Sequence, residues 1–289
     1  ATTAQLSVEY ENTFKSDHHV KGLLLGEERK YNGLGFNGHR EFSLDAVDQL
    51  YAGNTLNQST NSTNIDPQVN EGLVGRLNYD YKGIYLLEGS FRYDGSSKFA
   101  DGHKWGFFPA ISAGWRISEE PFLKNKSNIV QNLKLRASYG RLGDDGSSTY
   151  QYLSGYNYPN SNYVFGSSLV NGLGFRGMSN ENLTWYTSTL INLGLDGDLF
   201  NNKLHTEIDV FSKKRTGLLA TRNLSLPGTV GAGLPQENLN SDQTRGLELT
   251  ISHSNTVGEV SYNIAGNVAF TRTKNLYIER APSNNSFRN

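Results

Sequence analysis

The chain has 289 residues and a formal net charge of −1, with 27 basic and 28 acidic side chains. This balance gives no electrostatic reason to expect a nucleic acid partner, and the absence of cysteine excludes disulfides and thiolate metal sites. No run approaches the roughly 18 apolar residues of a transmembrane helix. Glycine and aromatic residues are abundant between Asn/Ser clusters, a composition that favours strands joined by polar loops.

Alternation of apolar and polar residues along the chain predicts about ten strands. In chain order, they are expected at 5–14, 18–26, 73–81, 84–94, 109–117, 133–139, 187–198, 202–213, 243–254 and 260–270. The alternation is clear in 73–81, 84–94, 109–117, 133–139 and 260–270, and weaker in the other five. The chain is therefore expected to be all-β and antiparallel.

The two sides of the clear strands differ in charge. In 84–94, for example, Leu87 and Phe91 share one side, whereas Glu88 and Arg92 lie on the other. In all five clear strands the apolar side carries no charged residue. A soluble sandwich with an apolar core shows the same alternation as a membrane barrel, so the pattern alone leaves both folds open.

The connections between these strands differ in length at the two ends of the sheet. Long connections at 27–70, 141–183 and 214–242 are expected at one end, and short turns at 15–17, 82–83, 199–201 and 255–257 at the other. Structureless loops this long are rare in compact soluble domains, whereas outer-membrane barrels combine short periplasmic turns with long extracellular loops. Aromatic residues near the strand ends fit the interfacial girdles of such barrels: Tyr81, Tyr85, Tyr93, Trp115 and Tyr139. The sequence therefore favours an antiparallel transmembrane β-barrel.

Two similar glycine-rich strings, NGLGFNG (32–38) and NGLGFRG (171–177), contain the G-x-G-x-x-G spacing of dinucleotide-binding turns. That function requires a preceding buried parallel strand and a following helix, and neither is predicted here. The flanking sequences differ, which argues against a repeated domain. We expect the glycines to allow tight left-handed turns in two similar loops at the same end of the sheet.

The sequence shows no convincing catalytic or metal site, and no cofactor is expected. Adjacent carboxylates on extended backbone diverge, and no metal-binding histidine spacing or nucleophile elbow occurs. GDDGSS (143–148) resembles a calcium loop but lacks the ligand spacing and terminal Glu of an EF-hand, and DGD (196–198) is interpreted as a tight turn.

Two sets of residues are candidates for ligand contact. The long connection 141–183 carries aromatic rings that either stack on a ligand or only pack the loop on itself: Tyr150, Tyr152, Tyr156, Tyr158 and Tyr163. The polar sides of the strands carry charges that would line the lumen of a wide barrel, or else pair with one another or with a plug: Arg76, Glu88, Arg92, Arg116, Lys134 and Arg136.

Three ordered blocks resemble a known family. Segment 73–125 forms the first, through RYDGSS (92–97), WGFFP (105–109) and AGWRISEE (113–120), and LKLRASYGRLGDDG (133–146) continues it. Segments 181–219 and 245–253 form the second and third. Together they resemble the SusC/RagA-type TonB-dependent outer-membrane transporters, and the similarity extends from about residue 5 to residue 275.

The resemblance implies a large barrel of about 22 strands, with a plug inside and a SusD-like surface lipoprotein outside. It also implies uptake of oligosaccharides or peptides, driven by a TonB complex, in the outer membrane of a Bacteroidota-like bacterium. Residues 1–289 are then expected to be one segment of barrel wall in contact with membrane lipid, without the plug, the TonB-contact segment or the final strands. The alternatives are a soluble all-β carbohydrate-binding module and a secreted β-rich hydrolase, and solubility without detergent would favour the module.

Overall fold

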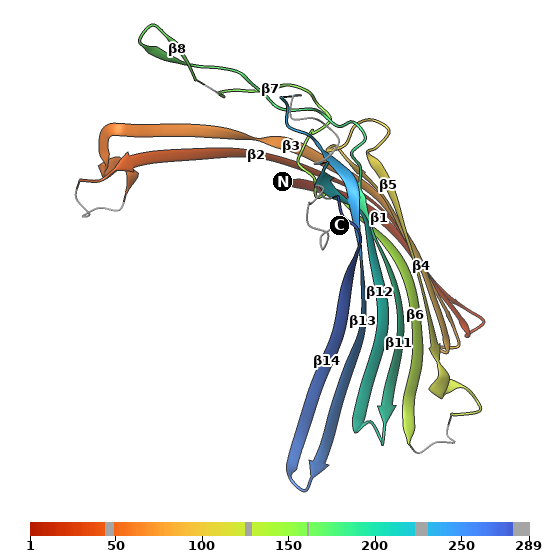
Figure 1. Ribbon diagram of the computed structural model, residues 1–289. Helices are drawn as coiled ribbons and strands as arrows, with labels where there is room; N and C mark the ends of the chain where they lie inside the picture. Colours follow the sequence, from red (N-terminus) through yellow and green to blue (C-terminus); the bar gives the residue numbers. More distant parts are fainter. Residues whose placement is uncertain (44–48, 125–128, 161, 223–230, 280–289) are drawn as a thin grey trace, which may run out of the picture.

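The computed structural model describes residues 1–43, 49–124, 129–160, 162–222 and 231–279. Within these ranges, ten strands form one antiparallel sheet in which each strand pairs with the one before it (Figure 1). The strands are β1 (Thr2–Phe14), β2 (His18–Glu41), β3 (Asn54–Tyr81), β4 (Tyr85–Ser96), β5 (Trp105–Arg116), β6 (Val130–Asp144), β11 (Tyr186–Leu199), β12 (Leu204–Thr221), β13 (Gln236–Val257) and β14 (Val260–Tyr277). All ten predicted strands are confirmed, and the predicted antiparallel, all-β fold is correct.

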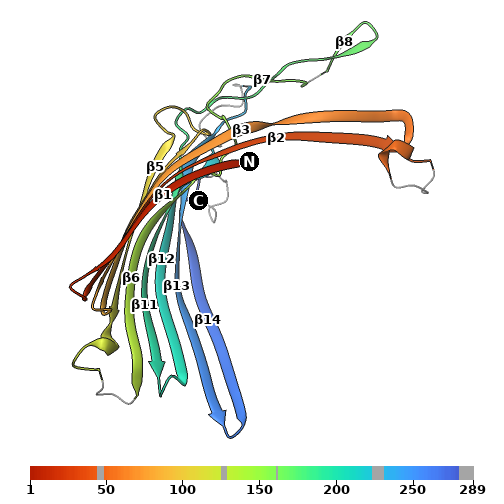
Figure 2. The same ribbon diagram turned by 180° about the vertical axis from the view of Figure 1, so that it is seen from behind.

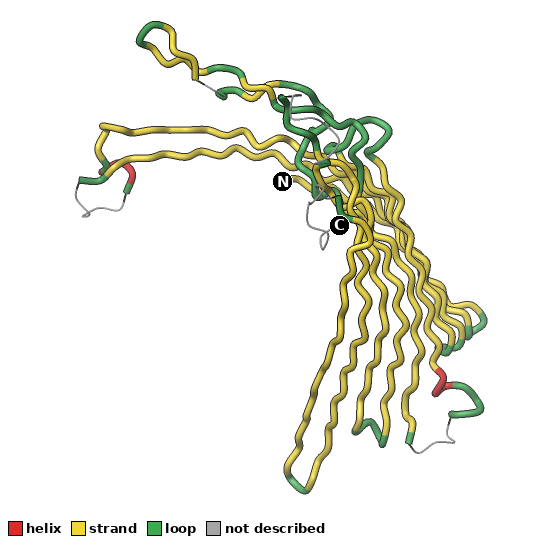
Figure 3. The backbone as a smooth tube through the Cα atoms, in the orientation of Figure 1, coloured by secondary structure: helices red, strands yellow, loops and turns green. Residues whose placement is uncertain are grey.

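Four shorter strands lie in the connection between β6 and β11. β7 (Tyr156–Asn157) pairs with β10 (Gly174–Phe175), and β8 (Asn162–Phe165) pairs with β9 (Ser168–Asn171). The helical content of the described residues is two single 3₁₀ turns, η1 (Leu50–Ala52) and η2 (Ile117–Glu119) (Figure 3). Among the described residues, no helix has the length and apolar character needed to cross a bilayer.

The large sheet is a single curved layer, and the described residues contain no second layer that covers its apolar side. Leu87, Ile111 and Trp115 remain 46%, 53% and 36% exposed. Only Phe99, Phe108 and Leu183 form a buried apolar core in the described part of the chain. A sandwich would bury the apolar side of its strands. The open apolar side therefore supports a barrel wall and does not support the soluble carbohydrate-binding module.

The register places the apolar side chains of neighbouring strands in continuous rows. Ala113 of β5 lies between Leu87 of β4 and Ala137 of β6, and Leu193 of β11 lies between Ala137 and Val210 of β12. Directly opposed residues of an antiparallel pair point to the same side of the sheet. A band of apolar side chains therefore runs across the convex side of the sheet.

An aromatic cluster marks the end of this band on β4 and β5. The Tyr85 hydroxyl and the Trp115 indole N–H both donate to the Glu120 carboxylate, at 2.5 and 3.0 Å. At the other end of the same strands, the rings of Tyr93 and Trp105 stack with their centroids 4.9 Å apart. Amphipathic rings at both ends of an apolar band are typical of membrane interfaces.

Long and short connections alternate as predicted, with the long ones at one rim of the sheet. The segment 27–70 is an exception to the prediction, because it is not a loop: β2 and β3 extend through most of it, and they pair from Tyr31–Gln68 to Glu41–Asn54 beyond the ends of β1 and β4. This hairpin projects from the rim, and the β8–β9 hairpin projects in the same direction in both views (Figures 1 and 2).

The two glycine-rich strings adopt different structures, so the expectation of two similar loops is wrong. Residues 32–38 are extended strand in β2, where Gly33 pairs with Ile65. Residues 171–177 end β9 and form β10, and there only Gly177 has a positive φ, of 105°. Pairing with a partner strand decides the backbone conformation of the first string, because glycine itself permits either conformation.

Candidate functional site

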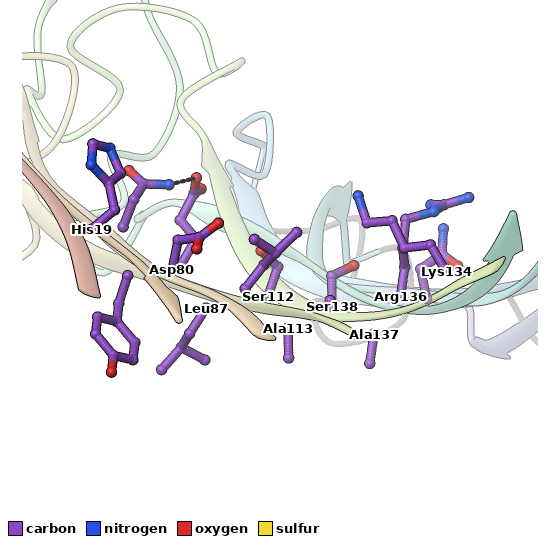
Figure 4. A pocket seen from close by; sticks show the side chains of 15 residues that line it. His19, Asp80, Leu87, Ser112, Ala113, Lys134, Arg136, Ala137 and Ser138 are labelled. Atoms are coloured by element: carbon purple, nitrogen blue, oxygen red, sulfur yellow. Dashed lines mark hydrogen bonds between the residues drawn. The ribbon is translucent and has the colours of Figure 1, made fainter. Parts of the chain in front are cut away.

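The concave side of the sheet carries a groove of about 420 Å³ over β3, β4, β5 and β6, flanked by His19 of β2 and Asn192 of β11. Figure 4 shows Asp80, Ser112 and Arg136 on this side, whereas Leu87 and Ala113 point to the convex side. The alternation of the strands produces this separation, because successive side chains of a strand point to opposite faces. The concave side is thus the side on which a polar ligand can bind.

Arg136 is the centre of an ion-pair cluster beside the groove. Its guanidinium donates to both oxygens of Asp196 at 2.6 to 2.9 Å, and to Asp209 at 3.0 Å. Gly194 provides the space, because a Cβ there would lie 2.6 Å from Asp209 and 2.7 Å from the Arg136 guanidinium carbon. The second oxygen of Asp209 is buried and has no hydrogen-bond partner among the described residues.

This cluster corrects the interpretation of DGD (196–198) as a tight turn. All three residues lie inside β11, and Asp196 faces Arg136 across the sheet. Asp198 hydrogen-bonds to Asn132 and to the imidazole of His205. The strand continues through the glycine because β6 and β12 pair with it on both sides.

A second cluster surrounds Arg92 near the rim with the long connections. Its guanidinium makes a two-pronged contact with Asp94 at 2.9 and 3.0 Å, and it reaches Glu27 of β2 at 2.7 Å. Gly72 leaves room for this cluster, since a Cβ there would lie 2.6 Å from Asp94. Bidentate pairing fixes the position of an arginine more firmly than a single contact does.

The remaining predicted lumen residues have different surroundings. Glu88 accepts a 2.6 Å hydrogen bond from Asn78, and Arg116 donates to the Gly83 carbonyl in a short turn. Lys134 lines the groove beside Arg136 (Figure 4). Arg76 is exposed on the strand between the groove and the Arg92 cluster. That these six residues line a water-filled lumen stays a prediction.

The predicted aromatic cluster does not gather in one place. Tyr150 and Tyr152 are half-buried with ring centroids 6.1 Å apart, and the Tyr150 hydroxyl donates to the Pro67 carbonyl. Tyr156, Tyr158 and Tyr163 are exposed, and the segment that carries them runs outward from the rim through β7 to β8 (Figure 1). The first two rings hold the connection on the rim. Tyr156 packs edge-on against Phe175, with ring centroids 6.1 Å apart, whereas Tyr158 and Tyr163 are exposed to solvent.

Sequence reasoning missed a small apolar core that fastens the long connections. The Trp185 ring contacts Phe99 and Phe108, at centroid distances of 5.6 and 5.4 Å, next to the buried Leu183. The Trp185 indole N–H donates to the Lys104 carbonyl at 2.9 Å. No period-2 pattern predicts this core, because Phe99, Leu183 and Trp185 come from two loops and only Phe108 lies in a strand.

In the loop between β4 and β5, the Lys104 ammonium lies 2.6 Å from Asp101. Its hydrogen bond lowers the pKa of that exposed carboxyl below the ordinary value. Lys104 therefore binds Asp101 through its side chain and Trp185 through its backbone carbonyl.

The possible calcium loop at 143–148 has another structural role. The Asp145 carboxylate accepts hydrogen bonds from Ser96 at 2.7 Å and Asn70 at 3.0 Å, and the Lys98 ammonium lies 3.7 Å away. These contacts tie three segments of the rim together. Within the described ranges, no group of three or more His, Cys, Asp or Glu side chains has an arrangement that would hold a metal ion.

Comparisons with known proteins agree with this architecture. A family model described as TonB dependent receptor-like, beta-barrel matches residues 2–288. TonB-dependent receptor P3 of Formosa agariphila is 33% identical over 297 residues, which cover 97% of this chain and 29% of that protein. TonB-dependent receptor SusC of Bacteroides thetaiotaomicron is 34% identical over 203 residues, which cover 67% of this chain and 20% of that protein.

Solved structures show the same fold. The RagAB peptide importer in its open-open state superimposes with a TM-score of 0.80 at 21% identity, over 96% of this chain and 30% of that chain. The chain therefore spans less than a third of the length of these relatives. On the strength of the family match over residues 2–288, this chain belongs to the TonB-dependent receptor β-barrel family, is of the SusC/RagA type, and forms part of a barrel in the outer membrane.

Proposed function

We propose that the receptor containing this chain imports oligosaccharides or peptides across the outer membrane. In this proposal the chain supplies barrel wall and outer loops, a SusD-like surface lipoprotein captures the cargo, and a TonB complex supplies the energy. The observation that carries the proposal is the single-layer sheet with an apolar convex side and a charged concave side. The similarity to SusC and to a peptide importer supports the transport class.

The concave side suits a polar cargo. Two arginines are held there by carboxylates: Arg92 by Asp94 of its own strand and by Glu27 of β2, and Arg136 by Asp196 of β11 and Asp209 of β12. Lys134 has no carboxylate within ion-pair distance in the described part of the chain. Fixed charges of both signs on a wide surface bind hydroxyl groups and peptide groups without enclosing them. The two pairs of carboxylates described above, Asp196 with Asp209 and Glu27 with Asp94, are neutralised by Arg136 and Arg92. The family is a class of receptors and transporters, not of enzymes.

The two projecting hairpins suit a protein partner. The β2–β3 hairpin exposes Leu34, Phe36 and Leu56, and the β6–β11 connection exposes Tyr158 and Tyr163. Exposed apolar and aromatic side chains beyond the membrane surface are typical of protein interaction sites. We assign them to the surface lipoprotein, which would close over the same rim.

The test uses the complete receptor, expressed with its lipoprotein in a strain that lacks both. Uptake of labelled oligosaccharides and peptides is measured with and without TonB. The proposal predicts TonB-dependent uptake of one of these classes, and retention of the lipoprotein on affinity-tagged receptor. Uptake that does not change when TonB is removed would contradict it.

A matched pair of variants tests the hairpin. L34S/F36S in the projecting part of β2 is expected to weaken lipoprotein retention, because it removes two exposed apolar side chains. As the control, T3S/Q5S on β1 changes the same number of exposed positions nearer the membrane. Equal retention by both variants would contradict the assignment of the hairpin to the lipoprotein.

A further inference from the structure

The convex side of the sheet carries a patch of basic residues immediately beyond the apolar band. Lys214 of β12, Arg245 of β13, and Arg272 and Lys274 of β14 form this basic patch. All four side chains are exposed. Arg141 of β6 belongs to the same row, because it lies opposite Thr189, which lies opposite Lys214.

The contacts of neighbouring residues fix the side to which the patch points. Phe211 packs over Gly246 on the concave side, where a Cβ at Gly246 would lie 2.6 Å from the Phe211 ring. Arg245, the residue before Gly246, therefore points to the convex side. Gln243 donates to Ser212 at 3.0 Å on that same side, next to Lys214 and opposite Lys274.

The patch lies at one level relative to the membrane. The last apolar residues of the convex band on these strands are Val210, Leu247 and Phe270. Arg245 is two residues from Leu247, Arg272 is two residues from Phe270, and Lys214 is four residues from Val210. Two residues span about 7 Å along a strand. The four cations therefore lie at the headgroup level of the leaflet on the long-loop side, which is the outer leaflet for this family.

No carboxylate compensates these charges within the described ranges, since none of the four takes part in an ion pair or a side-chain hydrogen bond there. Arg245 lies directly opposite Arg272. Like charges directly opposite each other on adjacent strands destabilise a sheet. Lys214 and Arg245 lie on inner strands of the sheet, so a further strand beside β14 would not reach them directly.

The opposite end of the same strands is different. Toward the short turns, the convex positions of β12, β13 and β14 carry Leu204, Thr206, His253, Asn255, Val260 and Tyr262, with no Lys or Arg among them. A patch that served to attract membrane phosphate in general would appear at both interfaces. Because the patch occurs at one interface only, the ligand that it fits is a lipid found in that leaflet and not in the other.

From this geometry we propose that the basic patch binds the phosphate groups of the phosphorylated glycolipid of the outer leaflet. A phosphate between Arg245 and Arg272 accepts charge-assisted hydrogen bonds from both guanidiniums and removes their repulsion. Lys214 and Lys274 flank this position as point charges. The lipid then acts as a bridge over β12, β13 and β14 on the outside of the barrel, independent of the cargo inside it.

The test uses the complete receptor, purified in detergent free of lipid. The probes are a purified phosphorylated glycolipid of the lipid A type, the same lipid after enzymatic removal of its phosphates, and phosphatidylglycerol. The variant is R245Q/R272Q, and the control is K213Q, which removes a positive charge from the neighbouring concave position of β12. Affinity is measured by fluorescence titration, and thermal stability with and without each lipid.

The proposal predicts that the phosphorylated glycolipid binds wild type and K213Q alike, and R245Q/R272Q roughly tenfold or more weakly, since two charged hydrogen-bond donors are lost. Without lipid, the double variant melts at the same or a higher temperature than wild type, because it removes a like-charge pair. If the double variant does not fold, K214Q/K274Q serves in its place.

Three results would overturn the proposal. They are equal binding of the phosphorylated and dephosphorylated glycolipid, equal weakening in K213Q and R245Q/R272Q, and binding of phosphatidylglycerol as tight as that of the glycolipid.

Discussion

The clearest prediction concerns Ile111 and Ser112, two adjacent residues of β5 that point to opposite sides of the sheet. Trp105 and Trp115 are ten residues apart at the two ends of the strand. At about 3.3 Å per residue and a tilt of about 40°, they are separated by about 25 Å across the membrane, the height of the apolar band of an outer-membrane barrel. Ile111 is one residue from the midpoint and is exposed on the convex side. Ser112 faces the concave groove (Figure 4).

Ile111→Arg is therefore expected to destabilise the receptor by about 2–4 kcal/mol, the cost of arginine at the centre of the lipid-facing side. This corresponds to a shift of about 30-fold to about 900-fold in the folding equilibrium. Ser112→Arg introduces the same side chain one residue away, opposite Glu88 on the polar side, and is expected to cost well under about 1 kcal/mol.

The measurement is a urea titration of each complete receptor in lipid vesicles, followed by tryptophan fluorescence. Equal destabilisation by the two variants would refute the assignment of the two sides. So would a larger cost for Ser112→Arg.

Two further predictions follow from the ion pairs and the rim. Arg136→Met leaves the Asp209 carboxylate without its cation and is expected to lower the urea midpoint of unfolding. Adding Asp209→Asn to this variant removes the unpaired charge and is expected to recover part of the lost stability. A double variant no more stable than Arg136→Met would contradict the coupling of the two residues. Gly143→Ala places a Cβ 1.9 Å from the buried Phe108 ring, so it is expected to destabilise the rim by about 1–3 kcal/mol. Gly89→Ala, where a Cβ meets nothing within 4 Å, is the control, and similar thermal melts of the two glycine variants would contradict the packing of Phe108.

Much of this fold could be predicted from the sequence because its determinants are local. The period-2 pattern of segments such as 84–94 depends only on the alternation of a strand, and the structure confirms it in β4. Periodicity alone could not distinguish a membrane barrel from a soluble sandwich. The resemblance in 92–120 to a known family resolved this choice.

Other features depend on pairing across the sheet and could not be predicted. The string NGLGFNG is flexible by composition, and only its pairing with residues 60–65 makes it a strand. Asp196 and Asp209 are far apart in the chain, and the register of β6, β11 and β12 brings both to Arg136. Gly72 and Gly194 lie opposite the ion pairs and leave room for them. If the strand register were known, the two glycines would indicate where the ion pairs form.

The most direct test of the central claim is a labelling scan along β5. Because the chain has no cysteine, single cysteines at positions 110–114 of the complete receptor carry a polarity-sensitive fluorophore without a background signal from this segment. In vesicles, the account predicts that labels at 111 and 113 are quenched by a lipid-soluble quencher, and labels at 110, 112 and 114 by a water-soluble one. Quenching without this alternation, or with the two sides exchanged, would contradict a barrel wall whose convex side faces lipid.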